Sequence, residues 1–267
     1  MTNTYETNDG LGGAVEVLGV NSLEAINRSE IDMQIATAKK YPRSMTVFRR
    51  RAIELATHDE ETAESCMYSV NVGGGKFATG KSIRMAEIVG ASYGNIRCSA
   101  TIIDQTERQV TARGMCIDLE TNFASSSEIV ESTVTKEGRP YSERQRLKVA
   151  KVALAKAWRD AMFRVVPGAL CKPIEDAARG LVVGDGTTAS ISKRRAKVMA
   201  WVHTLGIDDK RVFAALGIGG EDDIGIDQLT TLTGIKTRIK DQEATVDESF
   251  PLPDIPPVPP VGKTKVG

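Results

Sequence analysis

The stretch NIRCSATIIDQTERQVTARGMCIDLETNFASSSEIVESTV, residues 95–134, decides the fold. It contains three runs in which apolar and β-branched residues alternate with polar ones, and the turn-like segments DQTER and ETN separate the runs. Connections this short join antiparallel strands, because parallel pairing requires a crossover of about a dozen or more residues. The stretch therefore predicts a three-stranded antiparallel meander with strands at residues 95–103, 109–119 and 123–134.

Helical patterns flank the meander on both sides, and they set the fold class. Proline and glycine mark where the helices end, as at Tyr41-Pro42, Gly94 and Pro167-Gly168. The predicted class is α+β, with a core of helix, antiparallel β-meander and long basic helix, followed by a small C-terminal helical bundle. Before the meander we expect helices at residues 22–40, 44–57 and 83–93, with a mobile loop at 73–80, and after it a helix at 142–166.

Composition divides the chain into five segments. Polar, glycine-rich sequence predicts disorder at the N-terminus, and proline-rich sequence predicts an extended tail at the other end. The predicted segments are a disordered N-terminus (1–20), a central domain (21–178), a linker (179–191), a small helical domain (192–249) and a Pro-rich tail (250–267).

The charges are segregated along the chain although they sum to zero, with 35 basic and 35 acidic residues. Residues 39–51 contain no acid, and residues 136–164 are dominated by lysine and arginine. Residues 208–248 are rich in acids. A basic body followed by an acidic C-terminal part favours an anionic partner.

Cysteine and histidine usage argues against metal and disulfide chemistry. The cysteines form no CxxC pair, so the sequence predicts neither a zinc site nor a disulfide framework. The N-terminal residues lack the features of a secretion signal, and no apolar run approaches the roughly 20 residues that span a bilayer. We therefore expect a reducing, cytoplasmic location and no membrane. The residues concerned are Cys66, Cys98, Cys116, Cys171, His58 and His203.

The segment GKFATGKS, residues 75–82, fits the G-x-x-x-x-G-K-[ST] pattern of a phosphate-binding loop. Such a loop lies between a strand and a helix of a parallel α/β sheet, which a chain built around a meander does not form. We therefore interpret Gly75, Gly80, Lys81 and Ser82 as a decoy and expect no cofactor and no metal. A nucleotide-binding protein acting on DNA is the alternative that this motif leaves open.

The predicted long helix separates apolar and basic side chains. At about 100° per residue, Leu147, Leu154, Trp158 and Val165 form one seam, with Met162 close by. A different face gathers Lys148, Lys156 and Arg159. We expect a cationic path for phosphates along that face, extended by three arginines on neighbouring elements, Arg84, Arg97 and Arg113.

Catalytic signals are nearly absent, which predicts a binding protein rather than an enzyme. Asp118 and Glu120 are the one close carboxylate pair on a predicted strand, and the following ETN explains them as part of a turn. Tyr93, Tyr141 and Phe77 are candidates for stacking on bases. A duplex-binding regulator that uses the C-terminal helices is a further alternative, against which their acidity argues.

Four segments carry a resemblance to a known family: IDMQIATAKKYPRSMTVFRRRAIELA, SIRMAEIVGASYGNI, TARGMCIDLETN and ALAKAWRDAMFRVVPGAL. Together they resemble phage and prophage proteins related to the single-strand annealing recombinases. That superfamily includes RecT, Redβ, Erf and the eukaryotic Rad-fifty-two proteins. The sequence departs from the usual pattern at Gly80-Lys81-Ser82, where such proteins have Gly-Pro-Ser before the helix. The resemblance spans about residues 30–250, because DQLTTLTGIKTRIKDQEATVDESF, residues 227–250, is also similar to the small C-terminal helical module of such phage proteins.

This resemblance implies ATP-independent binding and annealing of single-stranded DNA in phage-type homologous recombination. It also implies a ring or filament of identical subunits, with a phage exonuclease and a host single-strand-binding protein as partners of the C-terminal helices. By the resemblance, residues 21–178 are the DNA-binding and oligomerisation domain. The DNA path would follow a groove between the β-hairpin and the long helix, at Arg97, Arg113, Lys148, Lys151, Lys156 and Arg159.

Overall fold

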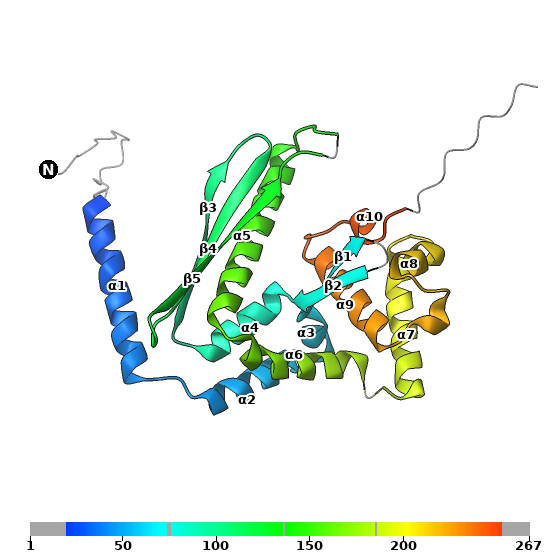
Figure 1. The fold of residues 1–267 in the computed structure, drawn as a ribbon, viewed down its shortest axis with the longest axis horizontal. Coiled ribbons are helices and arrows are strands. Elements are labelled where there is room, and N and C mark those ends of the chain that lie inside the picture. Colours follow the sequence, from blue (N-terminus) through cyan, green and yellow to red (C-terminus); the bar gives the residue numbers. More distant parts are fainter. Residues whose placement is uncertain (1–19, 74–75, 136, 185, 253–267) are drawn as a thin grey trace, which may run out of the picture.

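The computed structural model describes residues 20–73, 76–135, 137–184 and 186–252. Predictions for residues 1–19 and 253–267 lie outside this range. The described residues form an α+β fold, as predicted, with ten α-helices and two antiparallel sheets (Figure 1). The helices before the sheet of three strands are α1 (Val20–Lys40), α2 (Met45–Ala56), α3 (Glu60–Ser65) and α4 (Ile83–Tyr93), and those after it are α5 (Glu143–Val165), α6 (Gly168–Val183), α7 (Thr188–Thr204), α8 (Asp209–Leu216), α9 (Ile226–Lys240) and α10 (Val246–Ser249).

The predicted meander is present as the sheet β3–β4–β5, in which both neighbouring pairs are antiparallel. Exposure alternates strictly along β4, so Ala112 and Gly114 are buried while Arg113 and Met115 are exposed. One face of this sheet is covered by α5. The strands are β3 (Ile96–Gln105), β4 (Gln109–Asp118) and β5 (Phe123–Ser132).

Cys98 and Cys116 lie directly opposite each other on β3 and β4 and form a disulfide. The sequence predicted no disulfide, because the two cysteines are 18 residues apart and share no recognisable spacing. Their pairing is a consequence of strand register. Cys66 and Cys171 are buried free thiols, and burial raises the pKa of the Cys66 thiol to about 12.

Helix α5 approaches the sheet through small residues, which corrects the predicted apolar seam. A Cβ atom on Gly114 would lie 2.0 Å from the carbonyl oxygen of Ala157, so the backbones of β4 and α5 are almost in contact. Leu147, expected in the seam, is 61% exposed, and Leu154 and Trp158 are only partly buried. The side chains of α5 that are fully covered are Ala153, Ala157, Ala161, Met162 and Val165.

A second sheet replaces the mobile loop predicted at residues 73–80. Strand β1 (Met67–Gly73) pairs with β2 (Lys76–Lys81) to form an antiparallel hairpin. Ser69 of this hairpin is buried against Gly234 of α9, where an added Cβ would lie 2.7 Å from the Ser69 nitrogen. Phe77 packs on the core formed by the C-terminal helices rather than facing solvent.

The linker predicted at residues 179–191 is largely helical. Residues 179–183 complete α6, and residues 188–191 begin α7. Gly184 and Gly186 both have positive φ, at 79° and 77°, which allows the chain to turn sharply between the two helices. Figure 1 shows the result: α7, α8, α9 and α10 gather at one end of the molecule, and the hairpin lies between them and α5.

Arg43, which precedes α2, fastens the N-terminal helices to the end of the larger sheet. Its guanidinium binds both oxygens of Asp118 at 2.7 and 2.5 Å and Glu120 at 3.0 Å. Asp118 also accepts the Glu120 N–H at 2.9 Å, so the carboxylate pair shapes a turn, as the sequence predicted. Burial alone would raise the pKa of Asp118, but the hydrogen bonds from Arg43 and the Glu120 N–H hold it below its usual value.

Within the part of the chain that the structure describes, no helix combines the length and apolarity required to cross a bilayer.

Candidate nucleic-acid interface

A cleft of about 350 Å³ separates the hairpin from the C-terminal half of α5. Three cations and two aromatic rings line it, with one carboxylate, Asp160. Electropositive clefts that also offer aromatic rings are suited to single-stranded nucleic acid, because phosphates pair with the cations and bases stack on the rings. The lining residues are Tyr68, Ala78, Thr79, Gly80 and Lys81 from the hairpin, and Arg159, Asp160, Phe163 and Arg164 from α5.

Lys81, which is half-buried, and Arg164, which is exposed, are two of the three cations of this cleft. The ammonium of Lys81 lies 4.8 Å from the centroid of the Phe163 ring, a distance typical of a cation–π contact. Arg164 is exposed and donates one hydrogen bond, at 3.0 Å, to the carbonyl oxygen of Ser126. Neither side chain forms an ion pair with any described residue, so both charges remain available to a bound anion.

Arg159 is the third cation, and its side chain is largely buried in the α5 wall of the cleft. Its side chain is 12% exposed, binds Asp160 at 2.9 Å and lies 4.9 Å from the Tyr68 ring. Burial alone would lower the pKa of Arg159, but the charge of Asp160 and the hydrogen bond to it raise the pKa above its usual value. Its Nη1 atom is buried without a hydrogen-bond partner among the described residues, which is uncommon for a buried donor.

Tyr68 connects the cleft to the C-terminal helices. Arg238 of α9 lies 5.3 Å from the Tyr68 ring, and Arg159 of α5 also contacts this ring. Opposite Tyr68 on β2 stands Gly80, which has no side chain to cover the ring. Within the cleft the Tyr68 ring therefore borders Gly80 and is contacted by two guanidinium groups, those of Arg159 and Arg238.

The residues of the phosphate-loop pattern occupy different positions from those that such a loop requires. Gly80 and Lys81 belong to strand β2, and Gly75 lies outside the described residues. Ser82 is buried: its hydroxyl donates to the Ser65 carbonyl at 2.5 Å and accepts the Met85 N–H at the start of α4. The hydroxyl that would ligate magnesium in a phosphate loop is therefore already engaged in capping a helix.

The cationic path predicted along the sheet and helix is divided by the sheet itself. Arg97 and Arg113 lie on the face of the sheet that α5 does not cover. Arg97 binds Gln34 of α1 at 3.1 Å, and Arg113 binds Glu128 at 2.7 Å. The alternation of strand side chains places these two arginines and the cations of α5 on opposite faces. They cannot share one continuous path within a single chain.

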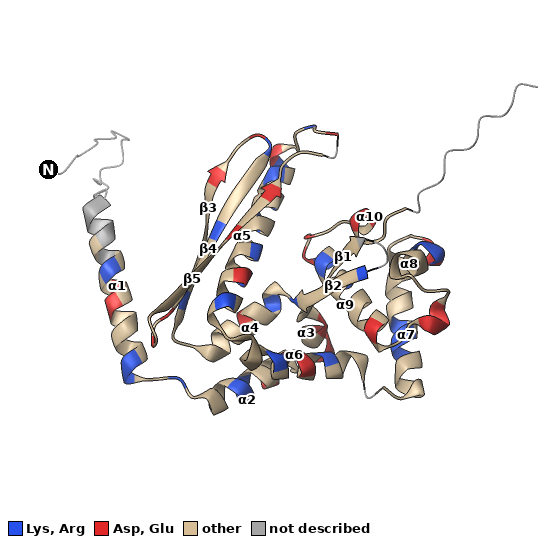
Figure 2. Ribbon diagram, viewed as in Figure 1, with Lys and Arg blue, Asp and Glu red and all other residues tan. Residues whose placement is uncertain are grey.

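The other predicted cations are distributed along α5 and around α4 (Figure 2). Lys148 and Lys151 are exposed and form no ion pair in the described parts of the chain. Lys156 is paired with Glu131 at 2.7 Å, and Arg84 is paired with Glu87 at 3.0 Å. Of the seven predicted binding residues, Arg159 alone lines the cleft.

Sequence reasoning overlooked the cleft because its hairpin wall was read as a loop. With the phosphate loop set aside, the sequence indicates Lys81 only as a further cation near the basic surface, and Tyr68, Phe163 and Arg164 carry no motif. One signal was available: Phe163 and Arg164 follow Arg159 by four and five residues, so both share the end of α5 with it.

A scan against protein-family models and searches of curated proteins and of solved structures found no match for this chain. The resemblance to the annealing recombinases therefore remains an expectation. Any functional conclusion depends on the geometry of the cleft.

Proposed function

We propose that this protein binds single-stranded DNA and anneals complementary strands without nucleotide hydrolysis. The observation that carries the proposal is the cleft between the hairpin and α5, where Lys81, Arg159 and Arg164 surround two aromatic rings. Cations supply affinity through release of counterions from the backbone, and the rings of Tyr68 and Phe163 offer surfaces on which bases stack without regard to sequence.

On this proposal, annealing involves no covalent chemistry. A cleft that holds the phosphates leaves the base edges of the strand accessible, so a complementary strand can pair with it. Stacking in the product duplex, at about 1.4 kcal/mol per step, drives the reaction. The protein's contribution is to concentrate and align the strands, which is why we assign it no catalytic residue, cofactor or metal.

The exposed lysines of α5 extend the same surface. Lys148 and Lys151 lie two to three turns before Arg159 on this 23-residue helix. The rise of 1.5 Å per residue places Lys151 about 12 Å along the axis from Arg159, a spacing that a strand leaving the cleft would cover with two or three phosphates. This is the role that we propose for the basic character of α5.

Self-association is part of the proposal, and α1 supports it. Of the α1 side chains that the structure describes, Ala38 alone is buried, and Met33 is exposed. The face of the larger sheet that α5 leaves uncovered also exposes apolar side chains, among them Met115 and Val130. Within one chain, α1 reaches this face through the Arg97–Gln34 hydrogen bond, and apolar side chains on both remain exposed among the described residues. Such exposed apolar surfaces are suited to pack between neighbouring chains, which builds a ring or a filament.

Sedimentation of the protein with labelled oligothymidine tests binding and assembly together. We expect the oligonucleotide to co-sediment with an oligomer, and the affinity to fall as salt rises, with a log–log slope of about −0.7 per phosphate contacted. A duplex of equal length should bind more weakly. A monomer that leaves the oligonucleotide free at low salt would contradict the proposal.

A further inference from the structure

The hairpin wall of the cleft packs mainly against the C-terminal helices and only at its base against the core of the central domain. Phe77 packs into the core of those helices, and Gly234 of α9 brings the α9 backbone against Ser69. The chain after α9 adds a further contact, because the Asn71 side chain donates to the Ser249 carbonyl. The opposite wall, α5, belongs to the core formed with α2, α4 and α6. Apart from Met67 at the base of β1, which packs in that central core, the two walls therefore belong to two different packing units.

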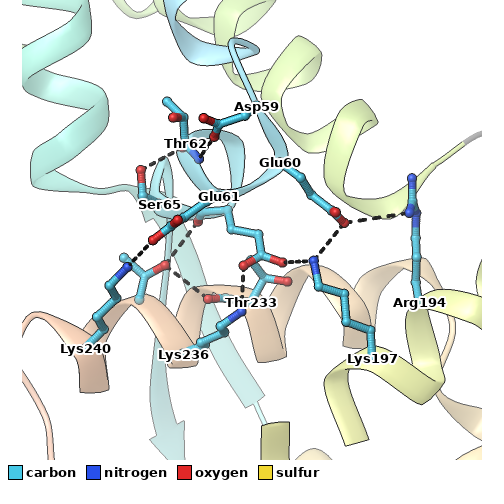
Figure 3. Close-up of polar contacts among 12 residues, drawn as sticks. Asp59, Glu60, Glu61, Thr62, Ser65, Arg194, Lys197, Thr233, Lys236 and Lys240 are labelled. Carbon is cyan, nitrogen blue, oxygen red and sulfur yellow. Dashed lines mark hydrogen bonds and ion pairs between the residues drawn. The ribbon is translucent and has the colours of Figure 1, made fainter. Parts of the chain in front are cut away.

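An ion-pair cluster joins these two units at α3. The central domain, which is rich in basic residues, contributes acidic side chains to this contact. The acid-rich C-terminal helices contribute lysines and an arginine. Glu64 lies at the centre, 15% exposed, and accepts hydrogen bonds from Lys236 at 2.6 Å and Lys197 at 3.0 Å. Figure 3 shows the acids of α3 directed towards the cations of α7 and α9. The surrounding pairs are Glu60 with Lys197 at 3.0 Å, Glu60 with Arg194 at 3.9 Å, and Glu61 with Lys240 at 2.7 Å.

Glu64 makes more interactions across this contact than the other acids of α3. Burial alone would raise its pKa, but hydrogen bonds from Lys236 and Lys197 lower it below the usual value, so it is held as a carboxylate. Its backbone carbonyl also accepts a hydrogen bond from Thr237 at 3.0 Å. Glu61 is 79% exposed and holds one lysine, and an ion pair in that setting contributes little.

We propose that this cluster, the α3 latch, positions the hairpin wall of the cleft and thereby sets the affinity for single-stranded DNA. The inference rests on the proposed function. When the latch holds, the C-terminal helices keep Tyr68 and Lys81 opposite Arg159 and Arg164. When it opens, the hairpin moves with α9, and the cations of the two walls no longer act on one strand. The C-terminal helices are then part of the binding site itself, in addition to any partner that they recruit.

Glu64→Gln in the full chain tests the latch, because the amide keeps the shape and removes the charge. Hydrogen–deuterium exchange of the β1 and β2 amides reports hairpin docking, and anisotropy with labelled oligothymidine reports affinity. If the docked state falls to about 10–20% of molecules, the apparent affinity falls about five- to tenfold. Glu61→Gln is the matched control on the same helix, with an expected change below about twofold.

Faster exchange in the hairpin together with weaker binding in Glu64→Gln, but not in Glu61→Gln, is the expected result. Faster exchange with unchanged affinity would overturn the inference while leaving the proposed function intact, and so would unchanged exchange. A wild-type chain without affinity for oligothymidine would overturn the proposed function and this inference with it. Lys197→Ala, at a half-exposed position that pairs with both Glu60 and Glu64, replaces Glu64→Gln if the latter does not fold.

Discussion

Replacing Lys81 and Arg164 together by alanine is expected to weaken single-strand binding about 10- to 30-fold at moderate salt. These are the two cations of the cleft that no described carboxylate neutralises, one on each wall. Each substitution removes one phosphate contact, so the loss of affinity should be similar for all sequences. The log–log salt dependence should flatten by about 0.7 for each substitution. Anisotropy titrations across a salt series measure both quantities.

Lys193→Ala with Lys210→Ala is the matched control for that double variant. Both lysines are exposed on the C-terminal helices and do not line the cleft, and the pair removes the same two charges. An equal loss of affinity from both double variants would mean that net charge alone governs binding, and the cleft assignment would be wrong. Substituting Lys156 and Arg159 is a less specific test, since one is paired with Glu131 and the other supports Tyr68.

Gly114→Val is expected to lower the free energy of unfolding by about 3 kcal/mol or more. The position is extended and fully covered, and even a Cβ atom would lie 2.0 Å from the Ala157 carbonyl oxygen and 2.3 Å from its carbon. Both atoms belong to the backbone of α5, so the helix itself would have to move away from the sheet, beyond the usual cost of overpacking. Urea denaturation followed by circular dichroism measures the change.

Gly180→Ala is the control, and it is expected to raise the free energy of unfolding. Gly180 lies in the exposed interior of α6, and a Cβ atom there would have no neighbour within 4 Å. Alanine at such a site should stabilise the fold by about 0.5–1 kcal/mol, because glycine loses more conformational freedom on folding. If Gly114→Val proved no more destabilising than Gly180→Ala, the close approach of β4 and α5 would be incorrect.

The sequence was informative where local pattern determines structure. The alternation along residues 109–119 predicted β4, and Pro167-Gly168 marked the end of α5 correctly. The sequence was misleading where the packing of a helix on a sheet determines which side chains are buried. At about 100° per residue the large apolar side chains appeared to form the buried seam of α5, and Met162 and Val165 are indeed buried. Beside Gly114, however, the helix lies so close to the sheet that the buried residues are Ala153, Ala157 and Ala161, and Leu147 is exposed.

The hairpin and the cleft could not be predicted for a related reason. Three consecutive glycines before Lys76 suggest a loop, and β1 is stabilised by packing on α9, which is more than 150 residues away in sequence. Two of the predicted cations, Arg97 and Arg113, were placed on the correct strands, but strand alternation alone does not say which face of a sheet a helix covers. The charge of the C-terminal segment suggested an acidic unit, whereas its lysines make the contact with α3.

Annealing of two complementary labelled oligonucleotides, followed by fluorescence energy transfer, tests the central claim most directly. The reaction is run with and without protein, first without nucleotide and then with ATP and magnesium. We predict that the protein accelerates pairing equally in both conditions, because Ser82 is engaged in capping α4 and the cleft requires no nucleotide. Acceleration that appears only with ATP and magnesium would contradict the account, and the residues of the phosphate-loop pattern would then need a functional role.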